Sequence, residues 1–509
     1  MRRISFAAIL LTTSCFALIR PVPAAAADAG KTLVPADWKS LHERWQNAVD
    51  ELNVPGLAIV AVEGDEVVLL DAIGHCDAQR KQPVAVRSPF YLASVTKSFT
   101  ALGIALLVEQ GKVKLDEPVQ TYLPRFTLAD PKLAETITVR DLLAHRQGLD
   151  SDPIGMAEAY FGNINDDRYY MLLGAVEPLG KFRYTNLHYT LAGRIIEAVS
   201  GQPWKDFLEQ RVFRPIGMPD ATCYASRLYA NPLAAWPIVE RDGELLRAQL
   251  VKNDQVMHAA GGMGASAADL GNWLRFQLTG KTPDGRQLVS PELLEQIHTR
   301  QVTDDRPGHP LPGFSRDGYA LGWFTGSFRD HPMLEHGGGY VGTSTLVSFL
   351  PDDNIGVAVL VNESVPNVGL TQMVTDDVYS KLLGLSPQDL LAEVRQISER
   401  LRKRAAERVE LTWEPPRVDN GLTQPIKAYV GTYRHPAWGD VVVTNSDEAL
   451  RLKIGTLELR CHALGKDSLR IEISPGDVVE GRFETDDQGA VTRMVVETPD
   501  GDAEFRKAS

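Results

Sequence analysis

The order of strand-like and helix-like segments is the feature that most constrains how this chain folds. Residues 57–71 hold two apolar runs around the turn Glu63-Gly64-Asp65-Glu66, a pattern typical of a β-hairpin. Further strand-like runs come much later in the chain, at 319–324, 343–350 and 355–361. The helix-like segments lie between, at 94–110, 189–200 and 267–278. This order predicts one sheet that is built from distant segments and covered by helices.

The C-terminal part of the chain has a different pattern. A charged amphipathic helix is predicted over 387–408, followed by the stiff linker Trp413-Glu-Pro-Pro-Arg. From about residue 424, short strands alternate with turns, which indicates a small antiparallel sandwich or half-barrel. The predicted fold class is therefore α/β (α+β), an antiparallel sheet flanked by helices with a helical subdomain, plus a C-terminal β-barrel-like domain. The expected boundaries are 37–385, a linker helix over 386–419, and a β domain over 420–509.

The first residues have the composition of a targeting segment. Arg2 and Arg3 precede an apolar run over 4–19, and the small residues 24–27 follow. This order is typical of a secretory signal peptide, predicted here over 1–27. An uncleaved anchor and a lipoprotein attached through Cys15 remain alternatives. We expect a periplasmic or secreted protein with no integral membrane span in the mature chain.

Charge and composition exclude several classes of protein. The 53 Lys and Arg against 66 Asp and Glu give a net charge of −13, and loss of the signal segment lowers it to −16. An acidic chain is a poor partner for nucleic-acid phosphates. The 11 His lack metal-ligand spacing, so we expect no metal or other cofactor. Beyond the signal, Cys76, Cys223 and Cys461 remain; a Cys76–Cys223 disulfide and buried free thiols are both possible.

Ser94 and Lys97 form the sharpest chemical signal, the spacing S-x-x-K at the start of an apolar helix. Residues i and i+3 share a helix face, so the Lys97 amine can lie against the Ser94 hydroxyl. A serine needs such a base to become a nucleophile, and burial lowers the pKa of a lysine enough to supply one. The alternative is a surface pair at helical spacing, which the apolar helix makes less favourable.

Two further segments carry suitable groups. Tyr184 and Asn186 precede the second strong helix and offer a phenol and an amide. His336 and the three glycines after it precede a strand-like run, where backbone N–H groups could face an oxyanion. Either segment alone is more often structural.

Together these motifs resemble the serine β-lactamase and penicillin-binding superfamily, and most closely its class C-like branch with D-aminopeptidases and family VIII esterases. The resemblance covers roughly 37–385, with the motifs in family order. They are Ser94-Val-Thr-Lys97, Tyr184-Thr-Asn186 and His336-Gly-Gly338; accessory stretches are 137–148, 260–263, 319–323 and 351–353. The segment from about 420 resembles the lipocalin-like domain appended to many of these hydrolases, which in relatives caps the active site or aids oligomerisation.

The resemblance implies a role for each residue. Ser94 would be acylated, Lys97 would help to deprotonate it, and Tyr184 would relay the proton. Asn186 would hold Lys97 and the substrate amide. The N–H groups of Ser94 and Gly339 would form the oxyanion hole, with Gly338 and His336 beside the substrate.

One departure bears on the substrate. His336 stands where the family often has the lysine of K-T-G, and a histidine is mostly neutral at pH 7. Efficient β-lactam hydrolysis and D-Ala-D-Ala recognition are therefore not expected to follow from the motifs alone. We read His145 as structural, and place the substrate-shaping loops at 151–180 and 223–254.

The leading hypothesis is an exported serine hydrolase that acts through an acyl-enzyme on small esters, D-amino-acid peptides or β-lactam-like amides; assembly as a homo-oligomer is compatible with it. A D,D-carboxypeptidase or penicillin-binding protein, or a true β-lactamase, is the alternative among enzymes. A non-catalytic cell-wall-binding or sensor protein is the alternative from another class.

Overall fold

The computed structural model describes residues 31–508, apart from 242, 306–310, 364–368, 414–420, 447–448, 475–476 and 499–500. The predicted signal peptide, with Cys15, lies outside the described residues, as does most of the predicted Trp413-Glu-Pro-Pro-Arg linker. No helix among the described residues is long and apolar enough to cross a membrane.

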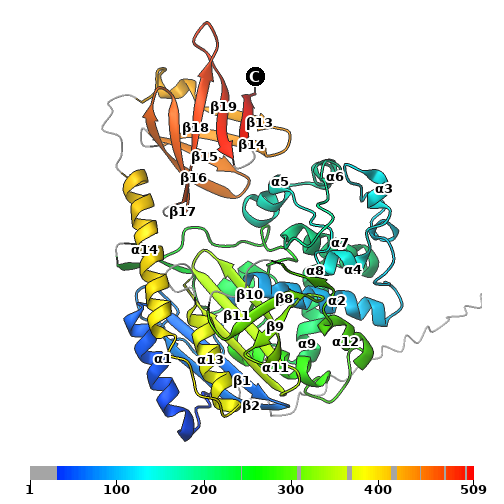
Figure 1. The fold of residues 1–509 in the computed structure, drawn as a ribbon. Coiled ribbons are helices and arrows are strands. Elements are labelled where there is room, and N and C mark those ends of the chain that lie inside the picture. Colours follow the sequence, from blue (N-terminus) through cyan, green and yellow to red (C-terminus); the bar gives the residue numbers. More distant parts are fainter. Residues whose placement is uncertain are drawn as a thin grey trace, which may run out of the picture.

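The centre of the molecule is an eight-stranded antiparallel sheet made from both ends of the 56–361 region (Figure 1). Its strands are ordered β2-β1-β12-β11-β10-β9-β8-β7. Their bounds are β1 Gly56–Glu63, β2 Glu66–Gly74, β7 Val302–Thr303, β8 Phe314–Tyr319, β9 Phe324–Phe328, β10 His331–Tyr340, β11 Thr343–Leu350 and β12 Ile355–Val361. The N-terminal hairpin joins the sheet where Leu57 pairs with Val361. The prediction of one sheet from distant segments is confirmed.

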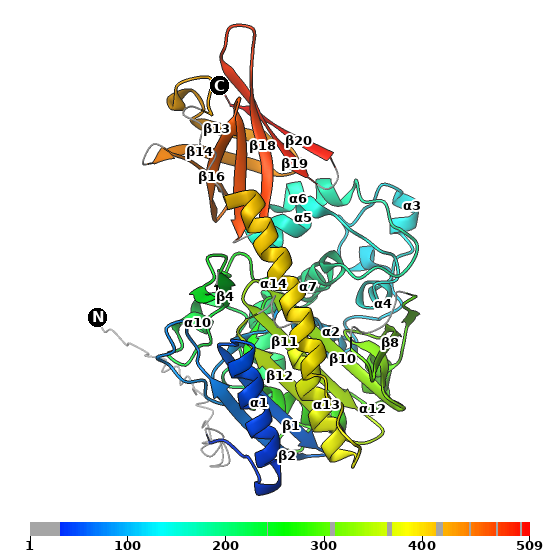
Figure 2. The same ribbon diagram turned by 60° about the vertical axis from the view of Figure 1, so that its left-hand side comes forward.

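Both faces of the sheet are covered, which explains the continuous apolar run of β1. Leu57, Ile59 and Ala61 pack into one core, whereas Ala58 and Val60 pack into the other. The first core is closed by α1 (Lys39–Glu51) and α13 (Leu370–Leu382), and the second by α2 (Thr96–Glu109) and α11 (Ala267–Thr279) (Figure 2).

A group of shorter helices forms a subdomain beside the sheet (Figure 1). The helices between β2 and β7 that have not yet been named are α3 Pro131–Ala134, α4 Val139–Leu143, α5 Asp152–Met156, the π-helix Ala157–Phe161, α6 Asp166–Leu173, α7 Asn186–Ser200, α8 Trp204–Leu208, the π-helix Glu209–Phe213, α9 Arg214–Ile216, α10 Ala225–Ala230 and α12 Pro291–His298, with short 3₁₀ turns besides. Two small antiparallel pairs complete the region: β3 Phe90–Tyr91 with β6 Gly264–Ala265, and β4 Ile238–Arg241 with β5 Glu244–Arg247.

The C-terminal strands close into an antiparallel barrel, reached through the long helix α14 (Leu391–Trp413) (Figure 2). Its strands are β13 Gly431–His435, β14 Gly439–Ser446, β15 Ala449–Ile454, β16 Leu457–Gly465, β17 Ser468–Ser474, β18 Asp477–Thr485, β19 Val491–Thr498 and β20 Gly501–Lys507. Aromatic and aliphatic side chains fill the interior, including Tyr433, Phe483 and Phe505. The predicted β-barrel-like domain is confirmed, and Tyr433 lies fully buried in its core.

A tight turn of the barrel rests on the helical subdomain. The Thr456 N–H donates to the Phe161 carbonyl at 2.7 Å, and the Asn253 amide donates to the Thr456 hydroxyl at 3.1 Å. Gly455 has φ +57°, and a Cβ there would lie 2.0 Å from the Phe161 oxygen, so only glycine fits. The barrel therefore bridges the π-helix that ends at Phe161 and the loop that carries Asn253.

One local prediction is wrong. Residues 320–323, expected within a strand, form the buried turn between β8 and β9, in which Gly322 has φ +90°. Apolar character there reflects burial of the turn, which periodicity cannot distinguish from a strand. The His336 motif precedes the strand β11, as predicted, and itself lies inside β10. Cys76, Cys223 and Cys461 are all free and buried, so the possible disulfide does not form in this structure.

Candidate active site

Ser94 lies on a strained turn where a buried segment reaches the surface. Every residue from Ser88 to Leu107 is buried except Ser94. A 3₁₀ turn over Ala93–Val95 leads into α2, and Ala93 has φ +47°, an unusual conformation for a non-glycine residue. Ser94 is thus the one partly exposed residue in an otherwise buried segment of the chain.

Lys97 is completely buried in the first turn of α2, directly below Ser94. Its Nζ is 3.1 Å from Ser94 Oγ, 2.8 Å from Asn186 Oδ1 and 2.8 Å from the Ala260 carbonyl. Burial lowers the pKa of Lys97 well below its usual value. A neutral amine can donate its two N–H bonds to the Asn186 and Ala260 oxygens. Its lone pair then faces the Ser94 hydroxyl.

Tyr184 and Asn186 enter the site at the N-terminus of α7. The Tyr184 ring covers the Lys97 amine, with 4.6 Å from Nζ to the ring centroid. Burial raises the pKa of Tyr184 above its usual value, and its hydrogen bond to Ser94 offsets only part of this rise. The phenol is therefore a proton donor at neutral pH.

His336 is 1% exposed, and both of its ring nitrogens have protein partners. Nδ1 is 2.8 Å from the Gly337 carbonyl and must donate, so Nε2 accepts from the Tyr319 hydroxyl at 3.1 Å. Burial, and secondarily the nearby Lys97, lowers the pKa of His336 to about 3. His336 is consequently a neutral group, 6.0 Å from the Tyr184 ring between centroids.

The glycines of β10 lie against the nucleophile turn. A Cβ on Gly338 would lie 2.0 Å from the Leu92 carbonyl, whereas nothing lies within 4 Å of the corresponding position on Gly339. β9 pairs with β10 only as far as Glu335, so the edge of residues 336–340 on that side is not covered by a strand. The structure thus brings all seven predicted site residues into one region.

Behind Tyr184, a buried histidine pair supports the start of α7. The Leu149 N–H donates to His188 Nε2 at 3.2 Å, so His188 Nδ1 carries the proton, with two acceptors in reach: Thr185 Oγ1 at 2.8 Å and His145 Nδ1 at 3.0 Å. Burial lowers the pKa of His188 to about 3. His145 has φ +55° and packs against Tyr184, with 4.7 Å between centroids. The structural interpretation of His145 agrees with this environment.

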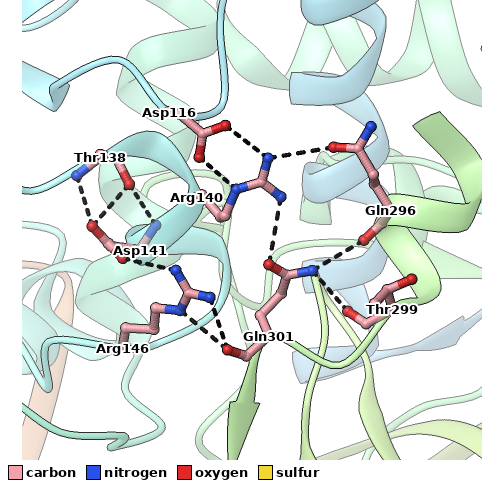
Figure 3. A network of polar contacts seen from close by, with 8 residues as sticks. All are labelled: Asp116, Thr138, Arg140, Asp141, Arg146, Gln296, Thr299 and Gln301. Carbon is pink, nitrogen blue, oxygen red and sulfur yellow. Dashed lines mark hydrogen bonds and ion pairs between the residues drawn. The ribbon is translucent and has the colours of Figure 1, made fainter. Parts of the chain in front are cut away.

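The segment before His145 is held by a polar network (Figure 3). The Arg140 guanidinium donates to both oxygens of Asp116 at 2.6 and 2.9 Å and reaches Gln301. Arg146 donates to the Gln301 carbonyl at 3.2 and 2.8 Å. These contacts fasten α4 to the chain before β7 and so fix the backbone that ends at His145.

A cavity of about 320 Å³ lies along α7, beyond the motif residues. Thr190 and Arg194 line it from the helix face that Asn186 begins. The other walls come from Trp204 and Lys205 of α8 and from two chain segments next to the barrel contacts, 157–166 and 255–259. The first lies in the predicted loop 151–180, whereas the second follows the predicted loop 223–254.

The sequence did not single out the Ala260 carbonyl as a partner of Lys97, although Ala260 begins the accessory stretch 260–263. Tyr319 also begins an accessory stretch, but nothing in the sequence placed its hydroxyl on His336. No group of three or more His, Cys, Asp or Glu side chains suited to a metal ion occurs among the described residues.

Comparison with known proteins agrees with this geometry. A family model described as Beta-lactamase matches residues 41–376. Protein flp of Staphylococcus aureus (strain MW2) is 27% identical over 347 residues, covering 66% of each chain. Penicillin-binding protein 4 of Amycolatopsis lactamdurans is 28% identical over 361 residues, covering 67% of this chain and 90% of that protein.

Solved structures share the fold at low identity. The octameric penicillin-binding protein homologue from Pyrococcus abyssi has a TM-score of 0.58 at 22% identity, covering 92% of this chain and 100% of that one. EstCE1, a hydrolase with promiscuous acyltransferase activity, has a TM-score of 0.57 at 21% identity, with coverages of 68% and 100%. D-amino acid amidase from Ochrobactrum anthropi SV3 has a TM-score of 0.53 at 23% identity, with coverages of 68% and 98%.

The fold and the arrangement of the motif residues place the chain in the β-lactamase-related class of proteins. The chain belongs to the β-lactamase family, whose model spans the sheet, the helical subdomain and all the motif residues.

Proposed function

We propose that this chain is an exported serine hydrolase that forms an acyl-enzyme on Ser94. The observation that carries the proposal is the Lys97 amine, which is fully buried, has a strongly lowered pKa and lies 3.1 Å from Ser94 Oγ. Two oxygen acceptors hold this amine in place. A pure binding site has no need of a buried base aimed at a serine.

The reaction follows from these positions. Lys97 takes the proton of Ser94 as Oγ attacks the substrate carbonyl carbon, and the N–H groups of Ser94 and Gly339 receive the oxyanion. The carbonyl re-forms as the bond to the leaving group breaks; Tyr184 donates its phenol proton to the departing atom and regains a proton from the Lys97 ammonium. Water then attacks the acyl carbon of the ester on Ser94 and loses a proton through Tyr184 to the neutral Lys97 amine; this proton returns to the Ser94 oxygen as its bond to the acyl carbon breaks, which gives the free acid and restores the serine.

The environment of His336 favours one kind of leaving group. His336 is neutral, and both of its ring nitrogens are hydrogen-bonded within the protein. It therefore supplies no positive charge at the place where the family often has the lysine of K-T-G. We therefore favour esters and amides whose leaving group lacks a carboxylate there. The relatives named as a hydrolase with promiscuous acyltransferase activity, a D-amino acid amidase and penicillin-binding proteins support the wider range of esters, D-amino-acid peptides and β-lactam-like amides.

The remaining parts of the proposal concern export and assembly. The N-terminal composition supports a cleaved signal and a periplasmic or secreted location. The octameric state of the Pyrococcus abyssi relative supports a homo-oligomer. Neither metal nor cofactor enters the proposed reaction. We retain the division into a hydrolase domain over 37–385, a linker helix over 386–419 and a β domain over 420–509.

A substrate panel tests the function. The purified protein is incubated with p-nitrophenyl acetate, D-Ala-p-nitroanilide and nitrocefin, beside Ser94→Ala and Lys97→Ala. Ser98→Ala is the matched control, because Ser98 is a buried α2 serine whose hydroxyl donates to the Val95 carbonyl at 2.9 Å. We expect turnover of at least one substrate by the wild type and by Ser98→Ala, and its loss in the other two variants.

The outcomes separate the alternatives. Preferential nitrocefin turnover would favour a true β-lactamase, and stable penicillin labelling without turnover would favour a penicillin-binding protein. Ligand binding without turnover or labelling at Ser94 would favour a non-catalytic binding protein and contradict the proposal.

A further inference from the structure

A buried lysine without an acidic partner lies beside the end of β10. Lys252 is 4% exposed, and its ammonium donates to the Ala159 carbonyl. It lies over the ring of Tyr340, 4.1 Å from the centroid, and 5.1 Å from that of Tyr160. No carboxylate of the described residues forms an ion pair with it, and burial lowers the pKa of Lys252 to about 7. A buried ammonium of this kind gains strongly from an added anion.

A group of phenols surrounds the same place. The rings of Tyr91 and Tyr160 each lie 5.6 Å from the ring of Tyr340 between centroids, and Tyr229 packs in the same cluster as Tyr91 and Tyr340. Burial raises the pKa of Tyr340 and Tyr91, so both phenols keep their protons. The Tyr229 hydroxyl is buried and has no hydrogen-bond partner among the residues that the structure describes. An unpaired buried O–H is costly and is free to donate.

The group adjoins the nucleophile turn. Tyr340 follows Gly339 on β10, and its ring packs edge-on against Tyr91, with 5.6 Å between centroids. Tyr91, Tyr229 and Tyr340 form one cluster with Ala93, the residue before Ser94. The space above Gly339 is open, so a chain bound along this edge can extend toward Tyr340.

The two ends of the edge correspond to the two halves of a substrate. Tyr184, the proton donor for the leaving group in the proposed reaction, lies beside His336 at the start of the free edge. The leaving group therefore points toward His336. The acyl group extends in the opposite direction, past Gly339 to Tyr340 and Lys252.

We propose that Lys252 and the Tyr229 hydroxyl form an anion subsite for the acyl half of the substrate, so that the preferred substrates are esters or amides whose acyl chain carries a carboxylate. This inference rests on the proposed hydrolase function. The carboxylate accepts one N–H of Lys252 and the O–H of Tyr229, which compensates the ammonium and satisfies the phenol. A charge-assisted pair of this kind is worth roughly tenfold or more in affinity.

Matched p-nitrophenyl esters test the subsite. The monoesters of glutaric and adipic acid are compared with the valerate and hexanoate esters, which have the same chain lengths without the charge. The readout is the ratio of kcat/KM for the charged ester to that for its neutral match. We expect this ratio to exceed about tenfold in the wild type for one chain length and to fall by about tenfold in Lys252→Gln.

Two further variants separate binding from a structural role. Tyr229→Phe keeps the ring that stacks on Trp236 at 4.5 Å and removes only the unpaired hydroxyl, so we expect stable protein with a ratio lowered several-fold. Lys205→Gln is the matched control. Its ammonium also donates to a carbonyl, that of Asp254, and lies 5.1 Å from the centroid of Tyr224, away from β10. The ratio should be unchanged there.

A wild-type measurement keeps the inference testable if Lys252→Gln does not fold. Glutarate should inhibit hydrolysis of the neutral ester competitively, and glutaramide should not. Equal kcat/KM for charged and neutral esters, an unchanged ratio in Tyr229→Phe, or no inhibition by glutarate would overturn the subsite while neutral-ester hydrolysis upholds the hydrolase function. Absence of all ester hydrolysis together with absence of labelling at Ser94 would overturn the function itself.

Discussion

Replacement of Asn186 by aspartate places a carboxylate against the Lys97 amine with little change in shape. Asn186 Oδ1 is 2.8 Å from Lys97 Nζ, so the new charge would contact the amine directly. An opposite charge at such a distance raises the pKa of a lysine by about 1–3 units, which corresponds to about 1.4–4 kcal/mol in favour of the ammonium. The carboxylate also occupies the N-terminal end of α7, where negative charge is favourable, so we expect the variant to fold.

The assay is the rate of Ser94 labelling by a fluorophosphonate between pH 5 and pH 10. Only neutral Lys97 can accept the serine proton, so the acid limb of the Asn186→Asp profile should move up by about 1–3 units. Labelling at neutral pH should fall by roughly 10- to 1,000-fold and recover at high pH. Asn272→Asp, in α11 away from the site, serves as the control. Superposable profiles for Asn186→Asp and the wild type would refute the role of Lys97 as the titrating base.

Three further predictions concern the supporting structure and are measured by thermal or denaturant unfolding. Gly338→Ala should destabilise the protein by roughly 1–3 kcal/mol, because its Cβ would meet the Leu92 carbonyl, whereas Gly339→Ala should unfold like the wild type. Equal stability of the two would contradict the packing. Burial and the nearby Asp220 raise the pKa of Asp269 from 3.8 to about 8, so its contribution to stability is complete below about pH 4 and is lost as the pH rises through 8. Asp269→Asn should flatten that dependence; an unchanged slope would exclude Asp269 as its source. Arg140→Ala should cost about 1 kcal/mol through loss of the Asp116 pair, and no loss would mean that the network contributes little.

The sheet was predictable where burial on both faces leaves a continuous apolar run. The segments 343–350 and 355–361 match β11 and β12, and the 57–71 hairpin became β1 and β2. The strand prediction failed at 320–323 because an apolar, buried segment need not be a strand. There a buried turn is as apolar as a strand, and only the positive φ of Gly322 distinguishes it.

The part of the site that is formed by side chains close together in the sequence could be predicted. Ser94 and Lys97 share a helix face, which sequence spacing alone implies. The Ala260 carbonyl could not be found in this way, because a backbone oxygen carries no residue identity. Lys252 lies in a loop without a motif, and its surroundings come from chain segments nearly 100 residues away on either side. Its proposed role therefore emerges only when those segments are brought together.

The most direct test of the account is the identity of the acylated residue. The wild type is incubated with a fluorophosphonate, and the adduct is located by intact-protein and peptide mass spectrometry. We predict one adduct on Ser94, its absence in Ser94→Ala and strongly slowed formation in Lys97→Ala. An adduct on another residue, or equal labelling of the wild type and Ser94→Ala, would contradict the assignment of Ser94 as the nucleophile.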